Sequence, residues 1–443
     1  MQNQGIRDAR SLGTPKLLVL GLQHMFAMFG ATVLVPALTG LSVSATLLFA
    51  GLGTLFFHFV TKGKVPAFLG SSFAYLAGYA AIAPNGEAAL LPYACVGVAA
   101  SGLLYLILAA LVCGFGANRV MRFFPPVVTG PIIICIGMTL ANSAINNCTG
   151  SWDIALVAIL TVVIFNIWGK GMLRIIPILL GVLVSYVYAA VTGRVDFSGV
   201  ASAAWIGLPV KMENTVFSLI GNCDANLLVT AIIAIMPIAF ATMIEHIGDI
   251  CAISSTVGAN FIADPGLHRT LLGDGLATSI ASLFGAPANT TYGENTGVLA
   301  LTRVYDPLVI RLAAVYAIIA SFCPKFAALV SAMPTGTIGG VSLILYGMIS
   351  AIGVRNLVEN RVDLAKSRNV IVVSLIISLA LGITFSAAGA ITFHVGEFTL
   401  NFSGLAVAAI VGIVVNAILP GKDYNFQNDY EYGKTTEDHG QML

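Results

Sequence analysis

The sequence predicts an all-α polytopic membrane protein with about fourteen transmembrane segments. Three observations predict it: the composition, the long apolar runs, and the placement of lysine and arginine. Hydrophobic residues make up 58% of the 443 residues and charged residues only 9%, whereas soluble domains carry about 25% charged residues. The mean hydropathy is +0.93. So few charged groups cannot cover a water-facing surface, which excludes an ordinary soluble enzyme, a disordered chain and, at a net charge of +1, a nucleic-acid-binding protein.

The apolar runs supply the spans, because a membrane-spanning helix needs about 20 apolar residues. In the first half the candidates lie at 17–40, 44–61, 68–82, 90–115, 125–145, 153–169 and 173–192. In the second half they lie at 225–251, 271–287, 293–303, 308–330, 334–352, 369–390 and 403–419. The third and tenth candidates, 68–82 and 293–303, are short and contain Gly and polar residues, and we call them the interrupted segments. The first run is too long for the apolar part of a signal peptide, so we expect no cleaved leader.

The basic residues indicate the orientation. If the N-terminus is cytoplasmic, only three of the 21 lysines and arginines fall on the outer side, namely Arg194, Lys211 and Lys325. Cytoplasmic loops of membrane proteins carry such an excess of basic residues. The asymmetry also favours the count of fourteen, because omitting one interrupted segment would invert every later loop. We therefore expect both termini in the cytoplasm, with a flexible polar tail at the C-terminal end.

The two halves of the chain echo each other. Three matches occur in the same order: Gln23-His24 with Glu245-His246, Gly70 to Ala74 with Asn289 to Gly293, and Pro125 and Gly130 with Pro334 and Gly339. Seven predicted spans separate equivalent points, and an odd number makes the second half enter the membrane from the opposite side. The sequence therefore predicts two inverted seven-span repeats, an arrangement typical of secondary transporters with a binding site near the midplane.

The interrupted segments occupy matching positions of the two halves, where the binding site of such a transporter is expected. Extended back to the prolines at their starts, Pro66 and Pro287, they cover 66–82 and 287–303. Each then carries hydroxyl residues and an aromatic: Ser71-Ser72-Phe73 and Thr290-Thr291-Tyr292. This composition favours two short extended strands over helix. Non-helical backbone at membrane depth is tolerated where protein buries it or where it lines a cavity. Half-helices that follow the strands would point their N-terminal N–H groups at electronegative ligand atoms.

Ionisable residues inside spans are costly and therefore candidate functional residues. Glu245 and Asp249 are spaced i,i+4 and share a helix face with His246 close by. Two carboxylates on one face in a low dielectric cannot both ionise cheaply, so one should bind a proton or hold a cation. The alternative is that this segment ends at the membrane interface and leaves these groups among the lipid headgroups.

Three further polar residues each have two readings. Glu294 begins the second half-helix and either contacts a ligand or only balances the helix dipole. Gln23 and His24 lie within the first span, where they either contact the ligand or form an interhelical hydrogen bond, and His24 can do both.

The seven cysteines are scattered, odd in number and never spaced as CxxC, so we expect no metal site, no disulfide framework and no cofactor.

These residues resemble a known family, the nucleobase/ascorbate transporters. The stretch from Glu294 to Arg303 fits that family's signature, an acid or Gln followed by Asn295, then Gly297, then Thr302 and Arg303. Gln23-His24 fits the motif of its first span. The resemblance covers the chain from Gln23 to about Ile418. Within the family it is strongest to the bacterial uracil carriers, on four stretches: 23–36, 70–74, 264–269 and 289–295.

The resemblance implies a core domain of spans 1–4 and 8–11 and a gate domain of spans 5–7 and 12–14. The expected boundaries are 1–16 for the cytoplasmic N-terminus, 17–115 and 223–331 for the core, 116–222 and 332–420 for the gate, and 421–443 for the tail. It also implies uracil import in symport with protons by alternating access across a bacterial inner membrane. The expected partners are uracil, H⁺, membrane lipid and a second copy in a homodimer, with no nucleic acid.

Matching the family's motifs assigns a role to each site residue. The resemblance makes Glu245 and Glu294 the substrate-binding carboxylates. It makes Phe73 and Gly293 the backbone amide donors, with Tyr292 and Tyr346 lining the pocket. It assigns proton coupling to Asp249, Glu245 and His24.

One departure keeps a second interpretation open. At the position of Asp249 the uracil carriers have His, whereas other members, including purine carriers, have Asp. The alternative is therefore a xanthine or purine symporter, with Na⁺ as an alternative coupling ion, although an acid at position 294 favours uracil. An anion exchanger is disfavoured because two carboxylates would repel anions. An intramembrane enzyme is disfavoured because the sequence has no HExxH or nucleophilic-serine motif.

Overall fold

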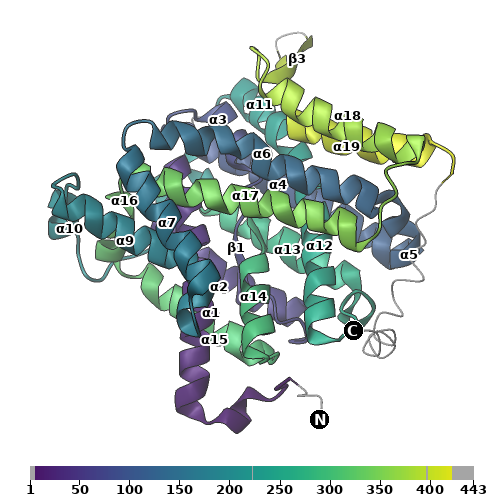
Figure 1. Cartoon of the computed structure of the whole chain (residues 1–443). Helices are drawn as coiled ribbons and strands as arrows, with labels where there is room; N and C mark the ends of the chain where they lie inside the picture. The colour runs from purple at the N-terminus through teal and green to yellow at the C-terminus, as the bar shows by residue number, and fades with distance from the viewer. Residues whose placement is uncertain (1–4, 222, 396–397, 422–443) are drawn as a thin grey trace.

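The computed structural model describes residues 5–221, 223–395 and 398–421, and these form a mostly helical molecule (Figure 1). The first half contains α1 (Thr14–Thr39), α2 (Val43–Val60), β1 (Leu69–Ser71), α3 (Leu76–Ile82), α4 (Leu91–Phe115), α5 (Ala117–Val120), α6 (Pro126–Cys148), α7 (Trp152–Trp168), α8 (Met172–Ile175), α9 (Pro177–Val191) and α10 (Ser198–Ser202). The second half contains α11 (Ala225–Ile235), α12 (Ala239–Val257), α13 (Leu267–Leu283), β2 (Asn289–Thr291), α14 (Gly293–Thr302), α15 (Pro307–Ser321), α16 (Pro324–Ser331), α17 (Thr335–Glu359), α18 (Ser367–Thr384), β3 (Ala390–Val395), β4 (Phe398–Ser403) and α19 (Gly404–Ile418). The tail that the sequence predicts to be flexible lies almost wholly outside the described residues.

Local sequence signals explain where several helices begin. The side chain of Asp224 accepts hydrogen bonds from the backbone N–H groups of residues 226 and 227 at the start of α11. Asp306 does the same for Leu308 in α15, and Ser403 for Ala406 in α19. Such caps satisfy N–H groups that have no partner within the helix. Asp, Ser and the following apolar run therefore mark these starts in the sequence itself.

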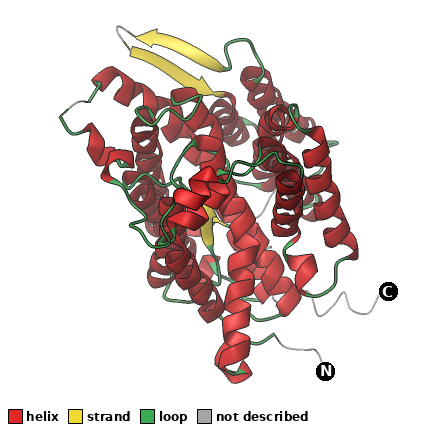
Figure 2. Ribbon diagram, turned by 90° about the vertical axis from the view of Figure 1, so that its left-hand side faces the viewer, coloured by secondary structure: helices red, strands yellow, loops and turns green. Residues whose placement is uncertain are grey.

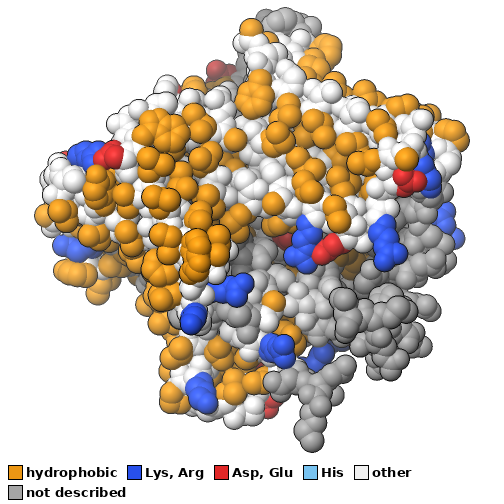
Figure 3. Space-filling view, viewed as in Figure 1, with side chains coloured by type: hydrophobic (Ala, Val, Ile, Leu, Met, Phe, Trp, Pro, Cys, Tyr) orange, Lys and Arg blue, Asp and Glu red, His pale blue; other side chains and the backbone are white. Residues whose placement is uncertain are grey.

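Within the described residues, seven helices are long and apolar enough to cross a membrane. An eighth candidate is the pair α15 and α16. The apolar run predicts one span over 308–330, whereas these two helices bend by 88° at the break between them. The helices α7, α9 and α19 are apolar but shorter. On one side of α7, Leu156, Leu160 and Ile164 recur every four residues and are about half exposed. Figure 3 shows apolar side chains spread over much of one face of the molecule, as expected of a surface that contacts lipid.

The two strands predicted in the interrupted segments are present. β1 pairs with β2 antiparallel, with Leu69 opposite Thr291, Gly70 opposite Thr290 and Ser71 opposite Asn289. Every residue of both strands is buried. Figure 2 shows this pair in the middle of the molecule. The α3 and α14 helices follow the strands, so the two interrupted segments are each a short strand that continues into a short helix.

The hairpin of β3 and β4 was not anticipated. The sequence analysis extended one span to residue 390 and began the next at 403, whereas α18 ends at Thr384 and the strands occupy most of the interval between these helices. The residues of both strands alternate between apolar and polar, which is the pattern of a strand. That signal is short and lies between two strong helical runs. Figure 2 shows the hairpin at one end of the molecule, and β4 contacts α11.

The helices pack as two groups. In one, α6 runs along α17, with α7, α9, α18 and α19 beside them (Figure 1). In the other, α1, α2 and α13 contact the β1–β2 pair, and α4 and α15 pack against these helices. Close approach of α6 and α17 depends on small residues: a Cβ on Gly137 would lie 2.2 Å from the carbonyl oxygen of Tyr346. The α12 helix lies between the groups, because it contacts α6 and α19 as well as α13 and α14.

Candidate functional site

The candidate site is built on the crossing of β1 and β2. Beyond the ladder, the Ser72 N–H donates to the Ala288 carbonyl at 2.8 Å and the Tyr292 N–H donates to the Phe68 carbonyl at 3.0 Å. Neighbouring helices hold the strands from outside. The Leu69 N–H donates to Thr54 Oγ1 of α2 at 2.9 Å, and Thr278 Oγ1 of α13 donates to the Asn289 carbonyl at 2.7 Å. The non-helical backbone is thus satisfied by protein, as membrane depth requires.

The sequence-predicted carboxylates of α12 lie on one face of that helix. Glu245, Gly248 and Asp249 are partly exposed. Ile244, just before them, and His246 and Ile247, between them, are buried. A Cβ on Gly248 would lie 3.8 Å from Ile133 of α6. The acidic face of α12 therefore points towards the boundary between the two helix groups.

Asp249 contacts the second strand. Thr291 Oγ1, at the end of β2, donates a hydrogen bond of 2.9 Å to Asp249 Oδ2. The other oxygen, Oδ1, lies 3.9 Å from where a Cβ on Gly293 would be. Gly293 is the first residue of α14, and the side chain of the preceding residue, Tyr292, does not cap the N–H groups of that helix. The carboxylate on α12 and the open N-terminal N–H groups of α14 thus lie side by side, a combination that can recognise a ligand carrying both donors and acceptors.

Two aromatic side chains close the site from opposite helix groups. The rings of Phe73, just after β1, and Tyr346, on α17, meet edge to face with centroids 5.7 Å apart. Both side chains are buried. Tyr292 is also buried, and its hydroxyl donates to the Ser71 carbonyl at 2.9 Å. The flat edges and faces of these rings suit a flat ligand.

The signature residues on α14 connect to the first span. The Asn295 side-chain amide nitrogen lies 3.2 Å from His24 Nδ1 and donates to the His24 carbonyl, also at 3.2 Å. Gln23, His24 and Asn295 are all buried. Of the two readings of His24, the interhelical hydrogen bond is therefore observed, and it joins α1 to α14. The helix ends in Arg303, which adopts a left-handed backbone conformation with φ of 54°.

The remaining signature positions are placed as follows. Gly297 is exposed on α14, and Thr302 Oγ1 donates to the Val298 carbonyl one turn earlier. Glu294 is the second residue of α14, but its side chain lies outside the described part of the structure. Its backbone follows Gly293 directly in the first turn of α14, beside the candidate site.

A buried pair lies behind the acidic face, and sequence analysis missed half of it. His246 Nδ1 lies 3.2 Å from Asp274 Oδ2 of α13, and both side chains have 0% exposure. The same ring nitrogen lies 3.4 Å from Thr291 Oγ1, which bonds to Asp249. Asp274 is an ionisable residue within a predicted span, so the rule that singled out Glu245 would also have found it.

Comparison with known proteins agrees with this architecture. The family model Xan_ur_permease, described as the Permease family, matches residues 15–389. The chain belongs to this family, the nucleobase/ascorbate transporters. Family members are permeases, so this protein is a transporter and not an enzyme, and its span-capable helices make it a multi-pass membrane protein.

Within the family, three relatives are similar over nearly their whole length. The uracil permease of Bacillus caldolyticus is 42% identical, covering 96% of both chains. That of Bacillus subtilis (strain 168) is 40% identical, covering 99% of this chain and 98% of its own. That of Escherichia coli (strain K12) is 38% identical, covering 90% of both chains.

Solved structures outside the family share its fold. The transmembrane domain of a cyanobacterial bicarbonate transporter, BicA, superposes with a TM-score of 0.63 at 13% identity, covering 94% of this chain and 100% of that chain. SLC26A9 superposes with a TM-score of 0.61 at 12% identity, covering 91% of this chain and 64% of that chain. At such low identity the likeness concerns the fold alone.

The strand crossing yields a first prediction. A Cβ on Gly70 of β1 would lie 2.5 Å from two ring atoms of Tyr292 and 2.8 Å from Thr32 Oγ1. Gly70→Ala therefore has to displace the Tyr292 ring, and overpacking of this kind costs about 1–3 kcal/mol. We expect a lower thermal unfolding midpoint in detergent. Gly382→Ala on α18, where no atom lies within 4 Å of the added Cβ, is the control and should leave the midpoint unchanged or slightly raised. Equal midpoints for the two variants would contradict the described crossing.

Proposed function

We propose that this transporter imports uracil in symport with protons, by alternating access, across the inner membrane of a bacterium. The observation that carries the proposal is the similarity of about 40% identity, over nearly the full length, to relatives named uracil permeases. The chemistry of the site supports it. Uracil is flat and alternates N–H donors with carbonyl acceptors, and the site combines carboxylates, open backbone N–H groups and aromatic rings.

In the proposed complex, Glu245 and Glu294 accept hydrogen bonds from the two N–H groups of uracil. The backbone N–H groups of Phe73 and Gly293 donate to its carbonyl oxygens, and Tyr292 and Tyr346 contact its ring. The edge-to-face contact of Phe73 with Tyr346 supports this placement, as does the closeness of Gly293 to the acidic face of α12. A pocket built for these groups rejects analogues that lack them, because its own polar atoms would be left without partners.

Proton coupling is assigned to Asp249 and Glu245, with His24 in support. In the proposed cycle, a proton from outside neutralises one carboxylate of the acidic face, which reduces the cost of two charges on one helix face. Uracil then binds, the protein opens inward, and both are released. The hydrogen bond from Thr291 to Asp249 supports a role for Asp249, because it orients the carboxylate beside Gly293. His24 contributes by holding α14 through Asn295.

The movement is proposed to occur between a core (17–115 and 223–331) and a gate (116–222 and 332–420), related as two inverted repeats with fourteen spans in total. The two helix groups support this division. The β1–β2 pair, α12 and α14 belong to the core, whereas Ile133 and Tyr346, which approach the site from the other side, belong to the gate. A ligand between the groups is then exposed to one side or the other as the core shifts. By the same resemblance we propose a homodimer.

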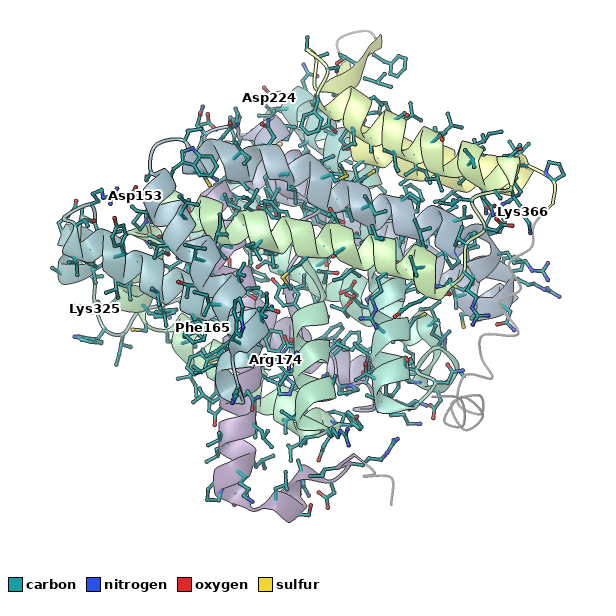
Figure 4. The ribbon with its side chains drawn as sticks, in the orientation of Figure 1. Asp153, Phe165, Arg174, Asp224, Lys325 and Lys366 are labelled. Carbon is teal, nitrogen blue, oxygen red and sulfur yellow. The ribbon has the colours of Figure 1, made fainter. Side chains whose placement is uncertain are left out.

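The proposed orientation places both termini in the cytoplasm. This orientation places Asp153, Asp224 and Lys325 outside. In Figure 4, Asp153 and Lys325 lie at the left and Asp224 lies at the top. Of the residues that it places in the cytoplasm, Lys366 lies at the right of the view and Arg174 lies below its centre. The start of α1 also lies towards the bottom of Figure 1. These positions support a membrane normal that runs diagonally across the view.

A thermal-shift panel on detergent-purified protein tests the substrate. Uracil is expected to raise the unfolding midpoint in a concentration-dependent way, because a ligand that binds only the folded state stabilises it. Thymine, xanthine and uric acid should give smaller shifts. A larger shift with xanthine than with uracil would refute uracil as the substrate. That outcome would favour the second candidate, a xanthine or purine symporter. Asp249 is consistent with that candidate, because the uracil carriers have His at this position.

Uptake into membrane vesicles tests the coupling ion. Labelled uracil should accumulate when a proton gradient is imposed and stop accumulating when a protonophore collapses it. Replacing Na⁺ by K⁺ should make no difference. Accumulation that survives the protonophore and follows the Na⁺ gradient would overturn proton symport.

A further inference from the structure

The residues before α1 are attached to the ends of the helices that carry the site. We call residues 5–12, which include the short 3₁₀ turn Ala9–Leu12, the N-terminal strap. The Ile6 N–H donates to the Arg303 carbonyl, and the Tyr305 N–H donates to the Ile6 carbonyl, both at 2.8 Å. These bonds form a parallel bridge between Ile6 and Val304. The strap is thereby joined to the segment that directly follows α14.

Arg7 extends the attachment to α12. Its guanidinium Nη2 donates a hydrogen bond of 2.9 Å to the carbonyl of Val257, the last residue of α12. Carbonyl groups in the last turn of a helix lack partners within the helix and carry partial negative charge, so a cation there is favourable. Two neighbouring residues of the strap thus connect the ends of two helices. Ile6 is hydrogen-bonded to the segment that follows α14, and Arg7 is hydrogen-bonded to the end of α12.

A third contact anchors the strap to α15. The Ala9 N–H donates to Asp306 Oδ2 at 2.8 Å, and Ala9 is completely buried. The other oxygen of Asp306 caps α15 through the Leu308 N–H, also at 2.8 Å. Each bond described here links the strap to the proposed core and not to the gate. The strap therefore moves with the core in the proposed cycle.

The C-terminal ends of α12 and α14, to which the strap is bonded, belong to the same two helices that carry the candidate site. The α14 helix has ten residues and is about 15 Å long. It begins at Gly293 and ends beside Arg303, so a shift at its far end is transmitted to its first turn. The α12 helix carries Glu245 and Asp249 and ends at Val257. The relative position of α12 and α14 decides whether the carboxylates of both helices reach one ligand.

We propose that the N-terminal strap, through Arg7, holds α12 in position relative to α14 and so sets the geometry of the substrate site. Arg7 is a positioning residue, about one helix length away from the substrate. This inference rests on the proposed function for its ligand, uracil. It goes beyond that function because it assigns a role in recognition to the segment before the first span.

The test compares three variants. Arg7→Ala removes the bond to Val257, and Arg7→Lys restores the charge and one donor. Arg10→Ala is the matched control, because Arg10 lies in the same strap, is exposed, and has no side-chain partner among the described residues. Uracil uptake is measured in proteoliposomes with the amount of transporter determined in each preparation. Hydrogen exchange of the backbone amides is followed in the last turns of α12 and α14 and in residues 304–305.

We expect Arg7→Ala to raise the KM for uracil at least threefold while kcat stays within twofold of the wild type. Exchange should become faster at the ends of α12 and α14. Arg7→Lys should recover part of the KM, and Arg10→Ala should match the wild type in both measurements. A role in folding alone would lower the yield of transporter and leave KM unchanged, and that result would overturn the proposal. If the wild type does not take up uracil, the proposed function fails, and unchanged exchange in Arg7→Ala would independently reject the strap.

Discussion

Glu245→Gln is expected to lower the efficiency of uracil uptake, kcat/KM, by about ten- to a hundredfold while the protein still folds. In the proposed complex the Glu245 carboxylate accepts a hydrogen bond from a uracil N–H. Hydrogen bonds to charged groups contribute about 1.5–3 kcal/mol, and each 1.4 kcal/mol is a factor of about ten. The glutamine amide keeps one acceptor but also presents an NH₂ group, which cannot accept. It also cannot take up a proton, so coupled transport is lost together with binding.

The measurement is initial-rate uptake of labelled uracil, normalised to the amount of transporter in the membrane. Glu359→Gln is the matched control, because it makes the same chemical change at an exposed position on α17, where Glu359 pairs with Arg355 of the same helix at 2.6 Å. Glu359→Gln should retain uptake within twofold. Wild-type KM and kcat in Glu245→Gln would show that the acidic face of α12 does not hold the substrate.

Asp274→Ala is expected to be among the most destabilising single substitutions in the core. His246 and Asp274 are both fully buried with 3.2 Å between Nδ1 and Oδ2, and the pair leads through Thr291 to Asp249. Removing one partner of a buried pair costs about 3–5 kcal/mol, because the other is left without compensation. The unfolding midpoint in detergent should fall. Uptake should fall with it because His246, which lies beside Thr291, loses the partner that holds its ring in place.

A double-mutant cycle distinguishes the pair from its parts. His246→Ala combined with Asp274→Ala should be less destabilising than the sum of the two single substitutions, because no partner is left stranded. Asp153→Ala is the control for loss of a carboxylate. It removes an exposed ion pair with Arg194, and such pairs contribute little, so the midpoint should barely change. Strict additivity of His246→Ala and Asp274→Ala would mean that the two side chains do not interact.

Much of the site could be predicted from short-range patterns. The i,i+4 spacing of Glu245 and Asp249 requires one helix face, and α12 shows that face. The Gly- and hydroxyl-containing stretches around Ser71 and Thr290 are poor helix material at membrane depth, and both are strands in the structure. The alternation of apolar and polar residues at 390–403 was equally local, but it was overlooked between two strong helical runs.

Membrane class and the two interrupted segments follow from the sequence alone, because apolar runs and strand-forming stretches act within a few residues of one another. The expected orientation follows from it too, because the positive-inside rule is a count of basic residues in short loops. The tertiary structure alone decided which side chains contact one another. Asp274 lies 28 positions from His246, Asn295 lies 271 positions from His24, and Arg7 lies 250 positions from Val257. No local pattern encodes such contacts, since they depend on how the helices cross and on the register in which β1 meets β2.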